Sequence, residues 1–247
     1  MTAPLHHLPP GSLAGVGVGQ AVMLDGAEGH HAATVRRVRV GAQLLLSDGS
    51  GLLATGEVTA VRGGEVDLTV LSVEDARLRG PRFVLAQALA KNGRDEQAVE
   101  SATELGVDAV IAWQADRCIV RWKGDRAAKS LGKWQSVATA AAKQSRRATI
   151  PEVTGPFDTA RLAAVVDDAA LALVLHEDAE TPLAGVDLPE FGDVVLIVGP
   201  EGGIGEDEVT RLVQAGARTV RLGSTVLRSS SAGPAALAVL NAAGRWR

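Results

Sequence analysis

The residues best suited to chemistry lie in a glycine-rich stretch, 199–205, which reads Gly-Pro-Glu-Gly-Gly-Ile-Gly. The stretch follows an apolar run and precedes a predicted helix. Glycine allows backbone conformations and a close ligand approach that a Cβ would block. Loops at the carboxyl ends of sheet strands are also where open α/β folds bind ligands. The stretch therefore predicts a ligand-binding loop, although a tight strand-to-helix turn without a ligand would have the same composition.

The loop lacks the features of a phosphate site. No Gly-Lys-Ser/Thr follows it, and the spacing Gly-x-Gly-x-x-Gly is missing. Three acidic residues, Glu206, Asp207 and Glu208, open the following helix, where they suit the helix dipole but would repel a phosphate. A neutral or cationic ligand of the adenosine type, held by backbone groups, fits better.

A second loop, 222–234, contains Arg228 between apolar residues and a run of serines. The serines could cap the last helix. An arginine in such a loop is most often an ordinary surface residue. Its position opposite the glycine-rich loop nevertheless supports a functional role for Arg228.

No metal site is predicted. The adjacent pairs His6-His7 and His30-His31 have no carboxylate or cysteine partner at ligand spacing, so we interpret them as non-metal residues. The single cysteine, Cys118, excludes an intrachain disulfide and fits a reducing cytoplasm. We interpret Cys118 as a half-buried strand residue rather than a nucleophile.

Two patterns divide the chain into domains. Short apolar runs separated by Asp-Gly and Gly-Gly turns predict a small β-rich domain over 1–74, followed by a charged linker over 75–81. From residue 82 to 247 apolar runs alternate with helical patterns, which predicts an α/β domain with a mainly parallel sheet. In the first domain we expect strands at 21–24, 43–46, 52–58 and 65–71 and a short helix within 28–39. In the second we expect strands at 83–89, 108–113, 169–175, 193–198 and 219–222 and helices at 95–105, 126–144, 206–215 and 230–243.

Composition narrows the choice of partners. Aromatic residues make up 3% of the chain and tyrosine is absent, which argues against a stacking platform for single-stranded nucleic acid. The net charge is −4, but residues 82–150 contain 12 basic and 7 acidic residues and form the candidate footprint for an anionic polymer. An ordinary solvated helix face is equally consistent with that charge. The N-terminus lacks the pattern of a signal peptide, and no apolar run reaches the roughly 18–20 residues of a membrane span, so we expect a soluble cytoplasmic protein.

Several elements in the right order carry a specific resemblance. Residues 199–203, with Leu222-Gly223 and Val226-Leu227-Arg228, resemble the C-terminal signature of the bacterial 16S rRNA uridine-N3 methyltransferases, the ribosomal RNA small subunit methyltransferase E family of the SPOUT class. The matching elements elsewhere are 28–39, 93–107 with its Glu-Leu-Gly-Val end, 116–118, and 141–151 with its Ala-Ala-Lys-Gln-Ser-Arg-Arg stretch. The resemblance covers nearly the whole chain.

The resemblance implies a C-terminal SPOUT α/β domain with a trefoil knot, a small N-terminal PUA-like β-barrel domain, and a homodimer. It implies S-adenosyl-L-methionine (SAM) as cofactor and a uridine of 16S rRNA in the small ribosomal subunit as substrate. The SAM pocket would be lined by Leu175, His176, Gly199, Pro200, Glu201, Gly202, Leu222, Gly223, Leu227 and Arg228. RNA binding would fall to Arg36, Arg37, Arg39, Lys91, Arg94, Arg117, Arg121, Lys143, Arg146 and Arg147.

The implied reaction needs particular groups. Methylation at uracil N3 requires an unpaired or flipped base and removal of the N3 proton. Arg228 is the candidate for stabilising the developing anion, and Glu201 is the candidate proton acceptor, with His176 as an alternative. The chain departs from the family at 5–10, where Leu-His-His-Leu-Pro-Pro replaces an Arg- and aromatic-rich strand, and at Ser229–Ser231, where an acidic residue is lost. We therefore assign no first strand over 5–10, and no catalytic role to the position of the lost acidic residue.

Two other functions remain open. Related knotted enzymes methylate ribose 2′-hydroxyls, but they carry a Ser-x-Asn-Val-Ser stretch near the end that this chain lacks. The other alternative is a non-catalytic ribosome-assembly protein that binds RNA with the same fold. The intact glycine-rich loop and Arg228 argue against it, whereas the altered serine run is compatible with it.

Overall fold

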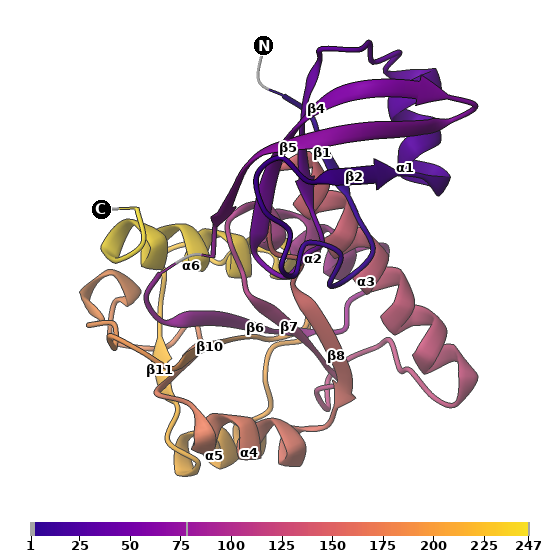
Figure 1. Ribbon diagram of the computed structural model, residues 1–247. Helices are drawn as coiled ribbons and strands as arrows, with labels where there is room; N and C mark the ends of the chain where they lie inside the picture. Colours follow the sequence, from indigo (N-terminus) through magenta and orange to yellow (C-terminus); the bar gives the residue numbers. More distant parts are fainter. Residues whose placement is uncertain (1–2, 78, 247) are drawn as a thin grey trace. The chain divides into compact units, whose positions relative to one another are not determined.

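Two separate hydrophobic cores divide the chain into two units. The computed structural model describes residues 3–77 and 79–246 (Figure 1). The first unit comprises Met1–Arg77 with Ala142–Ile150, and the second comprises Leu78–Ala141 with Pro151–Arg247. The described residues leave out 1–2, 78 and 247. Residues 1–2 belong to the predicted first domain, residue 78 to the predicted linker and residue 247 to the predicted second domain.

The first unit is built on a five-stranded sheet with the order β1-β3-β4-β5-β2. Its strands pair antiparallel except β1 and β3, which pair in parallel. The strands are β1 (Leu5–His7), β2 (Ala21–Leu24), β3 (Gln43–Ser47), β4 (Leu52–Arg62) and β5 (Glu65–Asp75). Strand β1 lies in the stretch 5–10 that departs from the family, so a first strand exists although no strand was assigned there from the sequence.

Local glycine and apolar patterns explain the long hairpin of this sheet. Gly63 and Gly64 join β4 to β5 with φ values of 56° and 98°, as the Gly-Gly signal predicts. Alternate side chains of both strands, among them Val58 and Leu68, are fully buried. The short helix expected within 28–39 begins two residues earlier: α1 (Gly26–His30) continues into a π-helical turn, His31–Val35, which ends before the arginines that follow.

A distant segment completes the first unit. Ser47 Oγ and the Gly51 amide both donate hydrogen bonds to the carbonyl of Ala148, at 2.8 and 3.0 Å. Lys143 Nζ lies 2.6 Å from Glu28 Oε1. Residues 142–150 were placed in the second domain, 82–247, from the sequence, whereas the structure assigns them to the first unit because of these long-range contacts.

The second unit has a six-stranded sheet with the order β11-β9-β10-β6-β7-β8, and all its neighbouring strands are parallel. The predicted α/β class with a mainly parallel sheet is confirmed. The strands are β6 (Arg82–Ala88), β7 (Ala109–Trp113), β8 (Glu152–Phe157), β9 (Leu171–Leu175), β10 (Asp193–Val198) and β11 (Arg218–Val220). The helices are α2 (Arg94–Glu104), α3 (Asp125–Gln144), α4 (Thr159–Asp168), α5 (Glu206–Gln214) and α6 (Ser229–Ala243).

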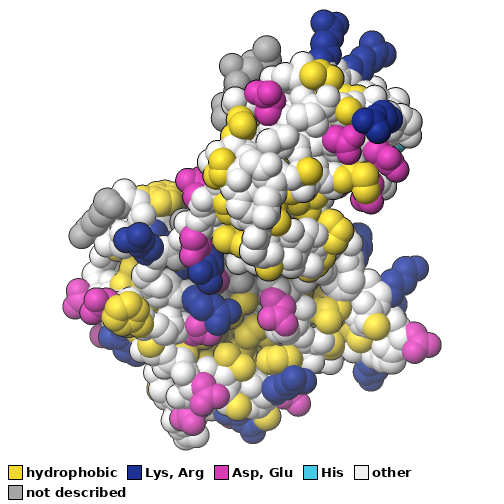
Figure 2. Space-filling model, viewed as in Figure 1, with side chains coloured by type: hydrophobic (Ala, Val, Ile, Leu, Met, Phe, Trp, Pro, Cys, Tyr) yellow, Lys and Arg dark blue, Asp and Glu magenta, His cyan; other side chains and the backbone are white. Residues whose placement is uncertain are grey.

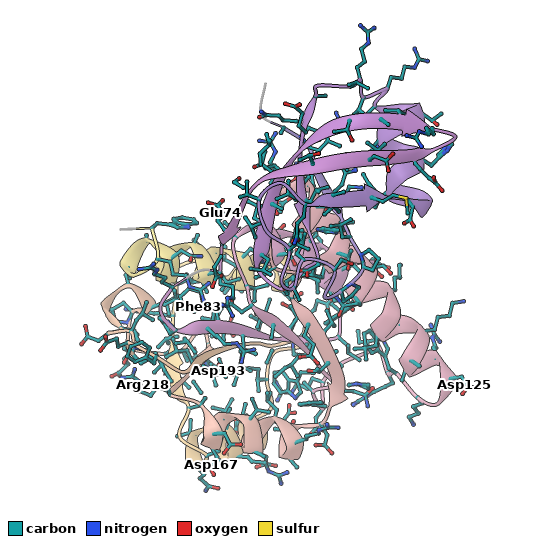
Figure 3. All side chains as sticks on the ribbon, viewed as in Figure 1. Glu74, Phe83, Asp125, Asp167, Asp193 and Arg218 are labelled. Atoms are coloured by element: carbon teal, nitrogen blue, oxygen red, sulfur yellow. The ribbon has the colours of Figure 1, made fainter. Side chains whose placement is uncertain are left out.

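Helices cover both faces of this sheet. Figure 1 shows α2 and α6 on one face and α4 and α5 on the other. The central strands β6 and β10 are accordingly apolar and buried over nearly their whole length, as expected for strands covered on both sides. Phe83 and Asp193, labelled in Figure 3, mark the amino ends of these strands, where Arg82 Nη1 lies 3.4 Å from Asp193 Oδ1. None of the described helices is both long and apolar enough to cross a bilayer.

Strand β8 and helix α4 were not predicted. Gly155 and Pro156 lie within β8, and both residue types argue against a strand in a sequence pattern. Helix α4 did carry a usable signal, because Asp158 accepts a hydrogen bond from the Arg161 amide at 2.8 Å as its N-cap.

Candidate functional site

Three loops meet at one edge of the parallel sheet. Strands β9, β10 and β11 are neighbours, so the segments that follow their carboxyl ends lie side by side. Together with Arg94 at the start of α2 and Arg117 in the loop after β7, these segments surround a cavity of about 750 Å³. The cavity therefore lies where an open α/β sheet binds its ligand.

All the residues predicted to bind the cofactor line this cavity. They are Leu175, His176, Gly199, Pro200, Glu201, Gly202, Leu222, Gly223, Leu227 and Arg228. Three acidic residues that sequence reasoning did not select, Glu177, Asp178 and Glu206, line it as well. The structure thus brings together residues that are more than 50 positions apart in the chain. Their role in binding the cofactor stays a prediction.

The glycine-rich loop needs its glycines for steric reasons. A Cβ at Gly199 would lie 2.6 Å from Ile204 Cγ1, closer than packed carbons approach. Gly203 adopts a φ of 73°, and its amide donates to the Pro200 carbonyl at 2.9 Å, which closes the turn. The backbone therefore doubles back on itself before α5 begins.

A buried carboxylate holds the end of this loop. Glu208 is 3% exposed; its Oε2 accepts from the Gly205 amide at 3.2 Å, and its Oε1 accepts from the Asp116 amide at 3.0 Å and from the Thr159 hydroxyl. Trp113 Nε1 donates to the same hydroxyl at 3.2 Å. Glu208 thus ties the glycine-rich loop to the loop that carries Arg117, a role beyond the helix-dipole effect inferred from sequence.

Two arginines predicted to bind RNA contact the glycine-rich loop. Arg94 Nη1 lies 3.3 Å from Glu201 Oε1, and Arg117 Nη1 donates to the Gly202 carbonyl at 3.3 Å. Asp95 anchors the loop before Arg94 by accepting from the Ala90 amide at 3.2 Å, and burial raises the pKa of the Asp95 carboxyl. Positive charge is thereby placed beside the predicted proton acceptor.

Arg228 occupies the N-cap position of α6 and is exposed. Among the described residues its guanidinium has no hydrogen-bonding or ionic partner, which leaves it available to a ligand. The expectation that the serine run caps this helix is wrong, because no side chain caps α6 and the buried Ser229 Oγ finds no partner in the described chain.

His176 lies in the loop after β9. Its amide donates to the Val220 carbonyl at 2.9 Å, and its Nδ1 accepts from the Asp178 amide at 3.3 Å. With Nδ1 used as an acceptor, a neutral imidazole carries its proton on Nε2. The free nitrogen of His176 is then a donor.

None of the other predicted RNA-binding residues is among those that line the cavity. Arg121 donates to the Asp116 carbonyl at 2.6 Å in the second unit, whereas Lys91 is exposed there. Arg36, Arg37, Arg39, Lys143, Arg146 and Arg147 belong to the first unit. On the face of the second unit drawn in Figure 2, Lys and Arg side chains are interspersed with Asp and Glu side chains.

The structure corrects the interpretation of Cys118 and one premise of the interpretation of the histidine pairs. Cys118 lies in the loop after β7 rather than in a strand, and it is 5% exposed; burial raises the pKa of its thiol to about 11. The histidine pairs do have a carboxylate partner, because His6 Nδ1 lies 2.9 Å from Glu28 Oε2. Sequence spacing could not show this contact, since the two residues are 22 positions apart on different elements.

Comparison with known proteins identifies both units. The family model of the RNA methyltransferase domain matches residues 79–241, and that of the RNA methyltransferase PUA domain matches residues 24–71. The ribosomal RNA small subunit methyltransferase E of Mycobacterium bovis is 45% identical over 236 residues, which cover 92% of this chain and 89% of that protein. The family resemblance seen in the sequence is thereby confirmed.

Two solved structures of SAM-bound methyltransferases are also similar to this chain. A methyltransferase from Legionella pneumophila, in complex with the bound cofactor SAM, has a TM-score of 0.82 at 29% identity and covers 98% of both chains. A ribosomal RNA small subunit methyltransferase E from Neisseria gonorrhoeae, bound to SAM, has a TM-score of 0.84 at 28% identity and also covers 98% of both chains.

Proposed function

The chain belongs to the ribosomal RNA small subunit methyltransferase E family and is a SAM-dependent rRNA methyltransferase; we propose that its target is N3 of a uridine in 16S rRNA. One observation supports this proposal above the others. The two loops that carry the family signature line one cavity at the carboxyl edge of the sheet, together with the loop after β9.

The residues of the cavity fit SAM. Its volume of about 750 Å³ lies within the roughly 300–1,000 Å³ of small-molecule sites. Glu177, Asp178 and Glu206 supply negative charge, which suits a ligand with a sulfonium and an ammonium group. This agrees with the sequence analysis, which disfavoured a phosphate ligand at this loop. Leu175, Leu222 and Leu227 offer apolar surface for an adenine ring. When bound, SAM supplies an electrophilic methyl group.

Arg228 is proposed to stabilise the uracil anion. Loss of the N3 proton leaves negative charge on N3 and the flanking carbonyl oxygens, and a guanidinium positioned there lowers the energy of that charge. Arg228 lies on the cavity wall without a partner among the described residues, so no existing ion pair has to break before it binds the base.

Glu201 is proposed as the proton acceptor in preference to His176. A carboxylate oxygen can accept the N3 proton directly, whereas the free nitrogen of His176 already carries a proton in the neutral tautomer that the Asp178 amide favours. Arg94 pairs with one oxygen of Glu201 and leaves the other available. Arg94 therefore acts as a positioning residue, and holding the base in line with the methyl group would supply much of the remaining acceleration.

RNA binding is proposed to use both units. Lys91, Arg94, Arg117 and Arg121 lie in the methyltransferase unit, and Arg36, Arg37, Arg39, Arg146 and Arg147 lie in the PUA unit. Contacts of this kind with phosphates supply affinity and salt dependence rather than sequence choice. Lys143 contributes less than the sequence suggested, because it pairs with Glu28.

Three further properties are proposed from the family. The segments around 199–203 and 222–228 would form the trefoil knot, and two chains would associate as a homodimer. Val226 is 75% exposed beside the cavity, and a second copy that covered it would also shield the site from water.

An enzyme that acts on 16S rRNA is expected in the cytoplasm.

Calorimetric titration of the protein with SAM tests the cofactor assignment. We expect one SAM per chain, with competition by S-adenosyl-homocysteine, which lacks the methyl group. Absence of binding in a folded protein would contradict the proposed function and would favour the non-catalytic assembly protein.

A further inference from the structure

We propose that the PUA unit binds one Zn²⁺ ion through His6, Glu28 and His31. The candidate ligand atoms of these three residues all lie within 4.8 Å of one another. His6 comes from strand β1, whereas Glu28 and His31 come from α1 and the π-helical turn after it. Two imidazoles and one carboxylate are a donor set that Zn²⁺ favours, with a fourth position left for water.

The distances are close to those of a metal site. A tetrahedral ion with bonds of about 2.0–2.2 Å holds neighbouring ligand atoms roughly 3.3 Å apart. His6 Nδ1 and Glu28 Oε2 are 2.9 Å apart, and the rings of His6 and His31 have centroids 5.8 Å apart at 51°. Side-chain movements of about one ångström would therefore bring the three ligands onto one ion. The ion would take the place of the hydrogen bond between His6 Nδ1 and Glu28 Oε2, and the neutral imidazole of His6 would then carry its proton on Nε2.

The protonation states suit metal binding. Burial alone would raise the pKa of Glu28, but hydrogen bonds from His6 and Lys143 outweigh it and lower that pKa to about 2. Burial, followed by the nearby Lys143 charge, lowers the pKa of His31. At neutral pH the site thus holds an ionised carboxylate and a neutral imidazole, which are the ligand forms.

Two cations lie close to the site and bear on its affinity. Lys143 Nζ contacts Oε1 of Glu28 at 2.6 Å, which leaves Oε2 for the ion. A ligating carboxylate commonly has its second oxygen held by a hydrogen-bond donor, so Lys143 can remain in place. The charge of Arg36 also acts on His31. Their repulsion lowers the affinity for a dication without blocking the ligand atoms.

An unpartnered nitrogen provides a separate argument. His31 Nδ1 is buried and has no hydrogen-bond partner among the described residues. A buried polar atom without a partner calls for an explanation, and a bound ion would supply the missing partner. The helix changes to a π-helical turn at His31, a local irregularity that is frequent at functional sites.

The helix that carries the ligands is also held firmly. A Cβ on Gly29 would lie 2.4 Å from the Leu24 carbonyl oxygen and 2.5 Å from that of Gly64, so α1 approaches β2 and the β4–β5 turn as closely as glycine permits. Strand β1 is only three residues long and pairs with β3 alone. An ion would join this short strand to α1 and stabilise the unit through mass action.

The test uses the full-length chain without an affinity tag, since a histidine tag would bind metal itself. Zn²⁺ is titrated by calorimetry, and Co²⁺ is used as a spectroscopic probe of tetrahedral coordination. The variants are His6→Ala and the near-isosteric Glu28→Gln. The matched control is His30→Ala, because His30 is exposed and adjacent to His31 but outside the cluster.

We expect one Zn²⁺ per chain, visible-region Co²⁺ absorption with tetrahedral intensity, and a rise in melting temperature with added Zn²⁺. Glu28→Gln should lose stoichiometric binding while it keeps SAM binding and fold, and His30→Ala should bind as the parent does. No stoichiometric binding by the parent would overturn the proposal. An equal loss in His30→Ala and Glu28→Gln would also overturn it, because the binding would then be non-specific.

Discussion

Arg94 and Glu201 are 107 residues apart in the chain, yet Arg94 Nη1 lies 3.3 Å from Glu201 Oε1 on the wall of one cavity. Arg94 begins α2 after strand β6, and Glu201 follows the neighbouring strand β10. The pair arises because adjacent parallel strands end at the same edge of the sheet. It links a residue predicted from sequence to bind RNA with one predicted to accept a proton.

Replacement of Glu201 by Gln should lower kcat by about 10²–10⁴, the usual contribution of a general base. The amide is nearly isosteric, so SAM affinity and melting temperature should change little. Steady-state methyl transfer with saturating SAM measures the effect. A Glu201→Gln enzyme with unchanged kcat would remove Glu201 from the mechanism.

A double-mutant cycle tests whether Arg94 acts through Glu201. Arg94→Ala should lower kcat in the parent but have little further effect in Glu201→Gln, with a coupling energy of about 0.5–3 kcal/mol. Strictly additive effects would show instead that Arg94 contacts the RNA on its own account.

Arg228→Ala should abolish methyl transfer while SAM affinity survives largely intact. The side chain has no partner in the described chain, so its removal leaves no buried group unsatisfied. Arg228→Lys is the matched control, because it keeps the charge but loses the planar fork of the guanidinium. Calorimetry and labelled methyl transfer measure the two properties. Equal loss of both would make Arg228 a residue of the SAM pocket.

Gly199→Ala should weaken SAM binding because the new methyl group would collide with Ile204, whose Cγ1 lies 2.6 Å from the Cβ position. The double variant Gly199→Ala/Ile204→Ala frees that space and should recover part of the affinity. Gly202→Ala is the control, since its Cβ would make only an ordinary contact at 3.4 Å with Arg117 Cβ. The prediction fails if the Gly199 variant binds SAM as the parent does.

Glu208→Gln should lower the free energy of unfolding by about 1–3 kcal/mol. Both carboxylate oxygens of Glu208 now accept hydrogen bonds from backbone N–H groups, of Gly205 and of Asp116. In the variant, the NH₂ group of the amide would replace one of these oxygens and would face an N–H donor. SAM affinity should fall as well, because Gly205 ends the glycine-rich loop. Asp207→Asn, at the exposed neighbouring position, is the control for charge loss. Denaturant unfolding that gave equal stabilities for both variants would refute the bridging role.

Sequence reasoning succeeded where the pattern was local. The continuous apolar runs of β6 and β10 predicted buried parallel strands, and the glycines of 199–205 predicted the loop beside them. The loops after β9 and β11 were assigned to the same site by the family resemblance, and the structure shows that they line one cavity because neighbouring parallel strands end at the same edge of the sheet.

The features that were missed depend on contacts between distant residues. Glu28 meets His6 and Lys143 only after folding, so spacing alone gave no carboxylate for the histidines and no place for 142–150 in the first unit. The bond from Asp116 to Glu208 spans 92 positions and follows no periodicity. Strand β8 was hidden by its own Gly155 and Pro156.

The central claim is methyl transfer from this cavity to uracil N3. The most direct measurement is incubation of labelled SAM with small ribosomal subunits that lack their base methylation, followed by nucleoside analysis of the 16S rRNA, with Arg228→Ala as the inactive control. The account predicts 3-methyluridine as the labelled product of the parent enzyme. A labelled 2′-O-methyl nucleoside, or no transfer to subunits or to free rRNA by a protein that binds SAM, would contradict it.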